Sequence, residues 1–98
     1  ISRYNALAIR DDVGALWENF CVIERIKHLQ KINRKAHTFF WRTHDQKEVD
    51  YLEEYDGKLD GYEFKWDKNN FSPPKDFLSY ANSSVKLVNK HNFKDFLL

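Results

Sequence analysis

The sequence predicts an α/β domain with a mixed, mainly antiparallel sheet of about four strands, flanked by a long N-terminal helix and a short second helix. Three observations predict this fold. Residues 13–27 form an apolar run behind two acidic residues, which is typical of a helix start. Three segments rich in aromatic and β-branched residues follow, and Asp56-Gly57 marks a hairpin between two of them. Pro73-Pro74 then opens a shorter helix, and a last strand follows at residues 85–89.

The N-terminal helix is expected to be largely buried. Asp11 and Asp12 precede its first apolar residue, so we expect them to cap it. One broad side of the helix collects Leu16, Trp17, Phe20 and Ile23. A second stripe consists of Glu18, Val22, Arg25 and Leu29. Glu18 is therefore not on an obvious solvent face, and Cys21 is expected to be a small buried hydrophobe.

The strands are predicted at residues 38–43, 48–55, 58–66 and 85–89, with a polar turn at residues 44–47. The first strand is dense in aromatic residues, so we expect it to be central and covered on both faces. Phe39, Phe40 and Trp41 could stack on nucleic-acid bases, but core packing is favoured. The short helix is predicted over residues 72–81 with Ser72 as its cap, and the apolar residues 92–98 are expected to dock onto the rest.

Length and composition limit the class of protein. A chain of 98 residues forms one domain, residues 1–98, with residues 1–12 as a linker or lead-in segment. The 32% of charged residues and a mean hydropathy of −0.75 exclude a membrane protein. The sequence has neither a secretory leader nor an apolar run that could span a bilayer. Because it contains no Met, we expect a fragment of a longer protein.

The charge and the single cysteine indicate the compartment and the kind of partner. Cys21 is the one cysteine, so no internal disulfide can form, which fits a reducing cytoplasm. The net charge of +1 is too small to predict nucleic-acid binding, so any phosphate binding must come from a local site. The four His residues lack ligand spacing, so we expect no zinc site and assign them no role.

The register of the predicted hairpin brings two carboxylates together. A two-residue loop at Asp56-Gly57 pairs Tyr55 with Lys58 and, further back, Asp50 with Glu63. One face then collects Val49, Tyr51, Tyr62, Phe64 and Trp66, with Val49 opposite Phe64. The other face collects Glu48, Asp50, Leu52, Gly61, Glu63 and Lys65. A bulged three-residue loop would shift this register by one residue.

Two adjacent carboxylates with Cβ atoms about 5 Å apart repel unless a cation or a shared proton compensates them. Leu52 and Gly61 leave space above the pair. Mg²⁺ prefers oxygen ligands and commonly uses one or two carboxylates with water and substrate phosphate, which Asp50 and Glu63 could supply. Lys65, one step along, could orient water and stabilise transition-state charge. The pattern predicts metal-assisted phosphodiester hydrolysis.

The segments Glu48-Val49-Asp50 and Glu63-Phe64-Lys65, behind a helix with a buried glutamate, resemble the PD-(D/E)xK nuclease superfamily with its restriction-endonuclease-like core. The motifs of residues 14–19, 40–43 and 62–66 more narrowly resemble the C-terminal domain of unknown function of bacterial and archaeal AAA-type ATPases. That resemblance covers nearly the whole chain. It implies Asp50, Glu63 and the Phe64 carbonyl as metal ligands, and Lys65 as the catalytic lysine.

The same resemblance implies Glu18 as the acid from the helix, with Mg²⁺ or Mn²⁺ as the ion. It also implies an ATPase domain upstream in the same chain, which would carry the ATP. Val49 stands where the superfamily name has proline, and this costs no ligand.

Structural explanations compete for the same residues. Acid-x-Lys also occurs at Asp45/Lys47 and Asp56/Lys58, so the motif alone is weak. Glu48 could pair with Lys65 across the strands. Glu18 could equally pair with Arg25. Arg42 could bind phosphate, although a strand-end surface position is favoured.

Two functions follow. The first is a Mg²⁺- or Mn²⁺-dependent nuclease module acting on DNA or RNA under control of an ATPase. The second is a non-catalytic partner-binding or regulatory module that keeps the nuclease fold. The near-zero net charge and the lack of a Lys/Arg cluster in the sequence favour the second.

Overall fold

The computed structural model describes residues 6–43 and 47–98, with side chains from residue 14 onward in the first helix. The elements run α1 (Ala6–Lys31), β1 (His37–Arg42), β2 (Glu48–Tyr55), β3 (Lys58–Phe64), α2 (Lys75–Leu78), β4 (Ser83–Val88) and α3 (Phe93–Leu97). This order confirms the predicted fold class and adds α3. Most of the turn predicted at residues 44–47, His44 included, lies outside the described residues.

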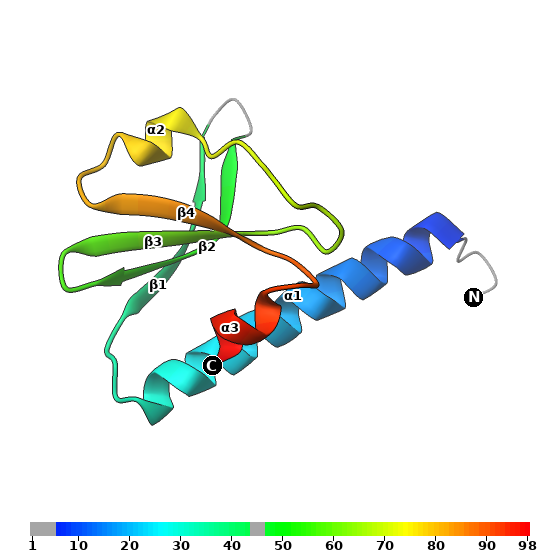
Figure 1. Cartoon of the computed structure of the whole chain (residues 1–98), viewed down its shortest axis with the longest axis horizontal. Helices are drawn as coiled ribbons and strands as arrows, with labels where there is room; N and C mark the ends of the chain where they lie inside the picture. The colour runs from blue at the N-terminus through cyan, green and yellow to red at the C-terminus, as the bar shows by residue number, and fades with distance from the viewer. Residues whose placement is uncertain (1–5, 44–46) are drawn as a thin grey trace.

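The four strands form one sheet in the order β1-β2-β3-β4. The β1–β2 and β2–β3 pairs are antiparallel, and β3–β4 is parallel. Figure 1 shows α1 and α3 on one side of this sheet and α2 on the other. In the described part of the chain, none of the helices is both long enough and apolar enough to cross a membrane.

The expectation that the first strand is central is wrong. β1 is an edge strand, because the β3–α2–β4 crossover adds the last strand beyond β3. Phe39 and Phe40 are consequently 51% and 55% exposed. Only Trp41 packs as expected, with its ring edge-on to Phe77 under α2 at 5.4 Å.

The hairpin forms as the sequence predicts. Asp56 and Gly57 both have positive φ angles, 54° and 78°, as a type I′ turn requires. The pairs run from Tyr55–Lys58 back to Tyr51–Tyr62, which confirms the predicted register over this stretch. β3 ends at Phe64, before the predicted end at Trp66.

Each face of the sheet has its own core. Under α1 and α3, the buried cluster consists of Cys21, Tyr51, Tyr62, Phe64, Val88 and Phe96. Under α2, it consists of Val49, Leu52 and Phe77. Gly61 is needed in the second core, because a Cβ there would stand 2.9 Å from Val49 Cγ1. The space expected above Gly61 is therefore filled by packing.

The inward side of α1 differs from the prediction. Leu16, Phe20 and Ile23 are 66%, 49% and 53% exposed, so most of the side expected to be buried faces outward. Trp17, from the same side, packs against the core as expected. The second predicted stripe faces the sheet instead, and Cys21 is fully buried as expected. The helix starts at Ala6, so the expected acidic cap at residues 11 and 12 lies inside it. Figure 1 shows the N-terminal part of α1 extending past the sheet, where no layer covers it.

The C-terminal third contains two short helices. α2 has only four residues, and Pro74 occupies its N-cap position without a side-chain cap hydrogen bond, so Ser72 does not cap it. The apolar tail forms α3 and inserts Phe96 against the rings of Tyr51, Tyr62 and Phe64. The tail therefore docks as expected, and the structure shows that its docking site is the core beneath α1.

Candidate functional site: a carboxylate cluster at the open end of the β2–β3 ladder

The candidate site lies where β2 begins and β3 ends. The β2–β3 pairing stops at Tyr51–Tyr62, and Asp50 and Glu63 are the next residues on each strand. Beyond Tyr62, β3 remains paired with β4 through Glu63–Leu87 and Phe64–Val88. The two central strands therefore separate at this end, which frees main-chain and side-chain groups for other partners.

A β-bulge lies in β2 at this point. Phe39 pairs with Leu52 and Trp41 pairs with Val49, so Asp50 and Tyr51 together stand opposite Phe40. The extra residue breaks the alternation of faces, and bulges of this kind re-aim side chains next to functional sites. The expectation that Val49 shares a face with Tyr51 and lies opposite Phe64 is accordingly wrong.

Because of the bulge, Val49 and Tyr51 lie in the cores on opposite faces of the sheet. Val49 packs with Leu52 and Phe77 beneath α2, whereas Tyr51 belongs to the core beneath α1. The hairpin register could be predicted from its turn, but the bulge arises from pairing with β1, which the hairpin alone does not specify.

Asp50 replaces a main-chain acceptor. The Phe64 N–H donates to Asp50 Oδ2 at 2.9 Å. In a continued ladder this N–H would meet the Val49 carbonyl, because hydrogen-bonded pairs alternate along antiparallel strands. The N–H and C=O of one strand residue point to the same edge, so the Phe64 carbonyl also faces the edge that Asp50 occupies.

Glu63 is held by its neighbour. Burial, a hydrogen bond with Asp50 and the charge of Asp50 raise the pKa of Glu63 to about 8, while Lys65 opposes the shift. At neutral pH, a protonated Glu63 therefore donates to the Asp50 carboxylate. The proton of Glu63 thus lies in the hydrogen bond between the two acids, where burial of Glu63 and the charge of Asp50 favour it.

Glu63 also borders a hollow of about 460 Å³. Its wall is formed by Lys47, Glu48, Ser72, Pro73, Pro74 and Lys75. Solvent and small anions can therefore reach the Glu63 side of the carboxylate pair.

Glu18 approaches from α1. Burial raises the pKa of Glu18, the charge of Asp50 raises it further, and Lys65 lowers it. These effects require the three groups to lie within electrostatic reach of one another across the helix and the sheet. The neighbouring thiol of Cys21 has its pKa raised to about 11 by burial and then by Glu18, so it stays neutral and is no nucleophile.

Lys65 follows the last residue of β3 and is exposed. Its N–H donates to the Val88 carbonyl at 3.0 Å, which extends the β3–β4 pairing to this residue. Its charge acts on both Glu18 and Glu63. The structure thus brings together Glu18, Asp50, Glu63 and Lys65, with the Phe64 backbone between them.

Two competing explanations for these residues are wrong. Glu48 pairs with Arg42 at 2.7 Å, not with Lys65. The Arg42 guanidinium also lies over the Phe40 ring at 5.2 Å, which confirms its strand-end surface position. Arg25 pairs with Glu53 and leaves Glu18 to face the sheet.

The Arg25–Glu53 pair was missed from the sequence. Glu53 is 1% exposed, and Arg25 donates to both of its carboxylate oxygens at 2.8 and 3.0 Å. The Tyr51 hydroxyl donates to Glu53 at 2.8 Å, and Arg25 also donates to the Phe96 carbonyl at 2.9 Å. A signal existed, because Glu53 has the same strand parity as the core residue Tyr51 and must face the same core.

The donor set fits a hard divalent cation. Across the described residues, no three His, Cys, Asp or Glu side chains are already gathered as a metal site. Mg²⁺ needs only one or two protein carboxylates, with water and substrate oxygens completing its octahedron. Asp50, Glu63 and the Phe64 carbonyl could meet that need, and a cation would replace the proton that now links the two acids.

The helix, three-stranded meander, helix and parallel strand define a small mixed α/β domain with an open acidic site at one sheet end. The chain belongs to the family of the domain of unknown function DUF4143, which it matches over residues 13–94. Every residue of the candidate site lies inside this matched segment. Searches of curated proteins and of solved structures found no match.

Proposed function

We propose that this domain is the nuclease-like C-terminal module of an AAA-type ATPase and hydrolyses phosphodiester bonds of nucleic acid with Mg²⁺ or Mn²⁺. One observation carries the proposal. At the bulge in β2, Asp50 accepts the Phe64 N–H at 2.9 Å and lies within hydrogen-bonding reach of Glu63, with Glu18 and Lys65 in electrostatic reach. The resemblance to the PD-(D/E)xK superfamily supports the same assignment.

Each residue has a role under this proposal. Asp50, Glu63 and the Phe64 carbonyl would hold the ion, and Glu18 would add a further acid from α1. A bound divalent ion polarises a phosphate oxygen and lowers the pKa of water. Lys65 orients the attacking water and stabilises the negative charge that develops on the phosphate. Asp50 also fixes the position of the Phe64 backbone through its hydrogen bond.

The metal site is tested by Mn²⁺ titration with residue-resolved NMR. Paramagnetic broadening should centre on Asp50, Glu63 and Lys65. Asp50→Asn should abolish it, whereas Glu54→Gln, at an exposed acid on the same strand, should leave it unchanged. Broadening elsewhere, or none at millimolar Mn²⁺, would exclude the site.

Hydrolysis is tested separately on single-stranded and double-stranded oligonucleotides. Cleavage should need Mg²⁺ or Mn²⁺ and should be lost in both Asp50→Asn and Lys65→Met. Cleavage that survives Asp50→Asn would come from a contaminating nuclease. Metal binding without cleavage would reject the catalytic proposal and retain the ion site.

A second candidate function is a non-catalytic module that binds a protein partner. The observation that favours it is the exposed apolar stripe of Leu16, Phe20 and Ile23 on α1. The occupant under this candidate is the ATPase domain of the same polypeptide, which the family resemblance implies. Phe20→Asp in the ATPase-containing chain should then release the domain to limited proteolysis, while Asp50→Asn should not.

A further inference from the structure

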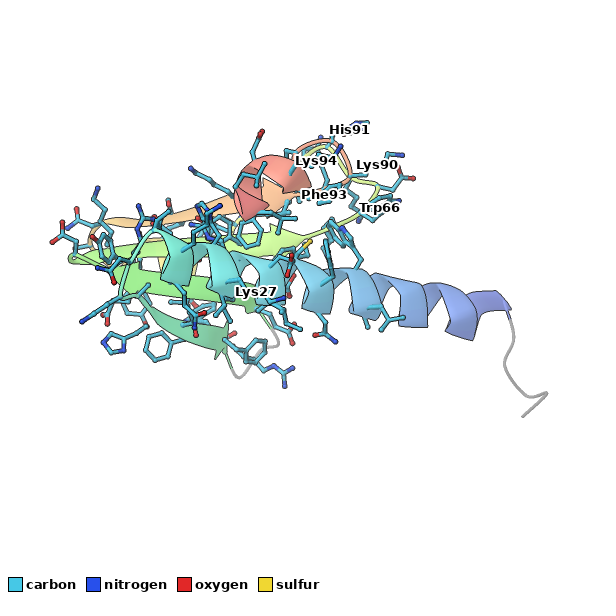
Figure 2. All side chains as sticks on the ribbon, turned by 90° about the horizontal axis from the view of Figure 1, so that it is seen from below. Lys27, Trp66, Lys90, His91, Phe93 and Lys94 are labelled. Carbon is cyan, nitrogen blue, oxygen red and sulfur yellow. The ribbon has the colours of Figure 1, made fainter. Side chains whose placement is uncertain are left out.

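A second surface of interest lies beside the carboxylate cluster and is built from two distant segments. β3 and β4 are parallel, so both leave the sheet at the same end. The segment after β3 carries Trp66 and Lys68, and the segment after β4 carries Lys90, His91 and Lys94, all of them exposed. We call these five residues the aromatic–basic surface. Figure 2 shows Trp66, Lys90, His91 and Lys94 gathered around the β4–α3 connection.

Trp66 is an exposed aromatic side chain in a defined position. It is 49% exposed, although a ring of this size is normally buried. From within, Trp17 contacts it nearly edge-on at 5.2 Å between ring centroids, and Phe93 lies at 6.2 Å. These two rings support Trp66 from the protein side while half of its surface stays available.

The connection that carries the lysines is held by two asparagines. Asn89 is 6% exposed and donates to the Lys68 carbonyl at 2.8 Å. Its side-chain oxygen accepts the N–H groups of His91 and Asn92 at 2.9 and 3.1 Å. Asn92 in turn donates to the Leu87 carbonyl and accepts the Asn89 N–H. These hydrogen bonds hold the two segments together in the free protein. Binding of a ligand therefore costs little conformational entropy at this surface.

A backbone hydrogen bond joins the segment that carries Lys90 to Trp66. The Lys90 N–H donates to the Trp66 carbonyl at 3.0 Å. The Lys90 ammonium is paired with Asp67, whose pKa it lowers. Lys68 lies two residues after Trp66 on the first segment, and Lys94 lies in the first turn of α3 on the second. Lys65 of the candidate site directly precedes Trp66, so the surface and the carboxylate cluster are adjacent.

We propose that the aromatic–basic surface binds single-stranded nucleic acid, with a base stacked on Trp66 and the flanking phosphates contacted by Lys68 and Lys94. Unpaired bases stack on exposed aromatic rings, and lysines follow the phosphate backbone. A duplex keeps its bases stacked on one another and cannot offer one to Trp66. The choice of nucleic acid as partner rests on the proposed function, and the surface narrows the substrate class to single strands.

The test is a titration with oligo(dT) in EDTA, so that no metal takes part, read by tryptophan fluorescence and by NMR chemical shifts. Trp66→Leu should weaken binding roughly 5- to 150-fold, the range of one lost base stack. Trp66→Phe should recover part of the affinity because it keeps a ring. Phe39→Leu, at an equally exposed aromatic on β1, is the matched control and should have no effect.

The contribution of Lys68 and Lys94 is measured from the salt dependence of oligo(dT) affinity. The slope of log affinity against log salt should fall by about 0.7 for each phosphate contact removed from a single strand. Lys68→Gln and Lys94→Gln should each show this change, and Lys58→Gln at the hairpin turn should not. NMR of each variant confirms that the domain is folded.

Several results would reject the proposal that the aromatic–basic surface binds single-stranded nucleic acid. Equal binding by folded Trp66→Leu, equal affinity for a duplex, or tighter binding of poly-glutamate than of oligo(dT) would each do so. The proposed function fails separately, because oligo(dT) binding in EDTA involves no metal and the Mn²⁺ titration involves no nucleic acid. If oligo(dT) binds but Mn²⁺ causes no broadening at the carboxylate cluster, the metal site alone is rejected. If Mn²⁺ causes the broadening but oligo(dT) does not bind, the aromatic–basic surface alone is rejected.

Discussion

The two ends of β2 carry carboxylates in opposite electrostatic situations. Glu53 is buried against a bidentate arginine and a tyrosine hydroxyl, so its charge is fully compensated. Asp50 and Glu63 are linked by the proton of Glu63 instead, and Lys65, whose charge acts on Glu63, is exposed. Buried charge is tolerated when paired, as at Glu53. The pair of Asp50 and Glu63 is thus compensated by a proton, whereas Glu53 is compensated by an arginine.

Removing Arg25 should produce the largest loss in the free energy of unfolding among the changes considered at the two ends of β2. Arg25→Met leaves Glu53 buried without a partner, and breaking such a pair costs about 3 to 5 kcal/mol. Chemical denaturation at pH 7 measures the loss in the free energy of unfolding. The control is Lys27→Met, since the surface pair of Lys27 with Glu24 should contribute no more than about 0.5 kcal/mol. A loss below 1 kcal/mol for Arg25→Met would contradict the assigned role of Glu53.

Adding Mg²⁺ should stabilise the domain, because the ion would supply a counter-charge to Asp50 and Glu63. At a hundred times its dissociation constant, a ligand of the native state stabilises by about 2.7 kcal/mol. The stabilisation should be larger at pH 8 than at pH 6, because the ion must displace the proton that Glu63 carries below about pH 8. Thermal unfolding measures both values. An equal shift in Asp50→Asn would place the ion elsewhere.

The same amide substitution should have opposite effects at the two ends. Glu53→Gln leaves the buried Arg25 guanidinium without a counter-charge and should destabilise the domain by about 2 kcal/mol, as for a lost charge-assisted hydrogen bond. Urea unfolding at pH 7 measures this. A neutral result would mean that Tyr51 and the Phe96 carbonyl satisfy Arg25 without Glu53.

Glu63→Gln should instead stabilise the metal-free domain at alkaline pH. A raised folded pKa favours the protonated form, so the stability linked to it is complete below the ordinary pKa of 4.5 and is lost as pH rises through about 8. Gln imitates the protonated acid, so the gain should be on the order of 1 kcal/mol at pH 9, after allowance for solvent screening, and nearly absent at pH 5. Melting temperature against pH measures it, and a variant less stable than the parent at pH 9 would contradict the shared proton.

The sequence predicts the carboxylate pair at the start of β2 better than the buried Glu53 near its end. Asp56-Gly57 specifies the turn, and the turn specifies the register, so the approach of Asp50 to Glu63 could be predicted locally. Glu53 was overlooked because its partner lies on α1, far away in the chain, and helical periodicity alone chose the wrong inward side. Leu16, Phe20 and Ile23 are as apolar as a core stripe, and only the position of α1 over the sheet shows that they face outward.

The same limit applies to the edge of the sheet and to charge. The aromatic content of β1 predicts a strand but not its place in the order, which depends on the crossover to β4. No Lys/Arg cluster is visible along the chain, yet the parallel exit of β3 and β4 brings the segment that carries Lys68 against the segment that begins at Asn89 and carries Lys90. Such discontinuous sites depend on topology, and short sequence patterns do not record it.

The buried ion pair also bears on how the chain finds its register while folding. A hairpin closes in about 1 to 10 μs, so β2 and β3 can pair through their type I′ turn before α1 docks. If the pairing slipped by one residue, Glu53 would turn away from the helix and Arg25 would lose its buried partner. Only the correct register allows α1 to seat its arginine. The ion pair therefore favours the native register of β2 and β3 over a one-residue slip.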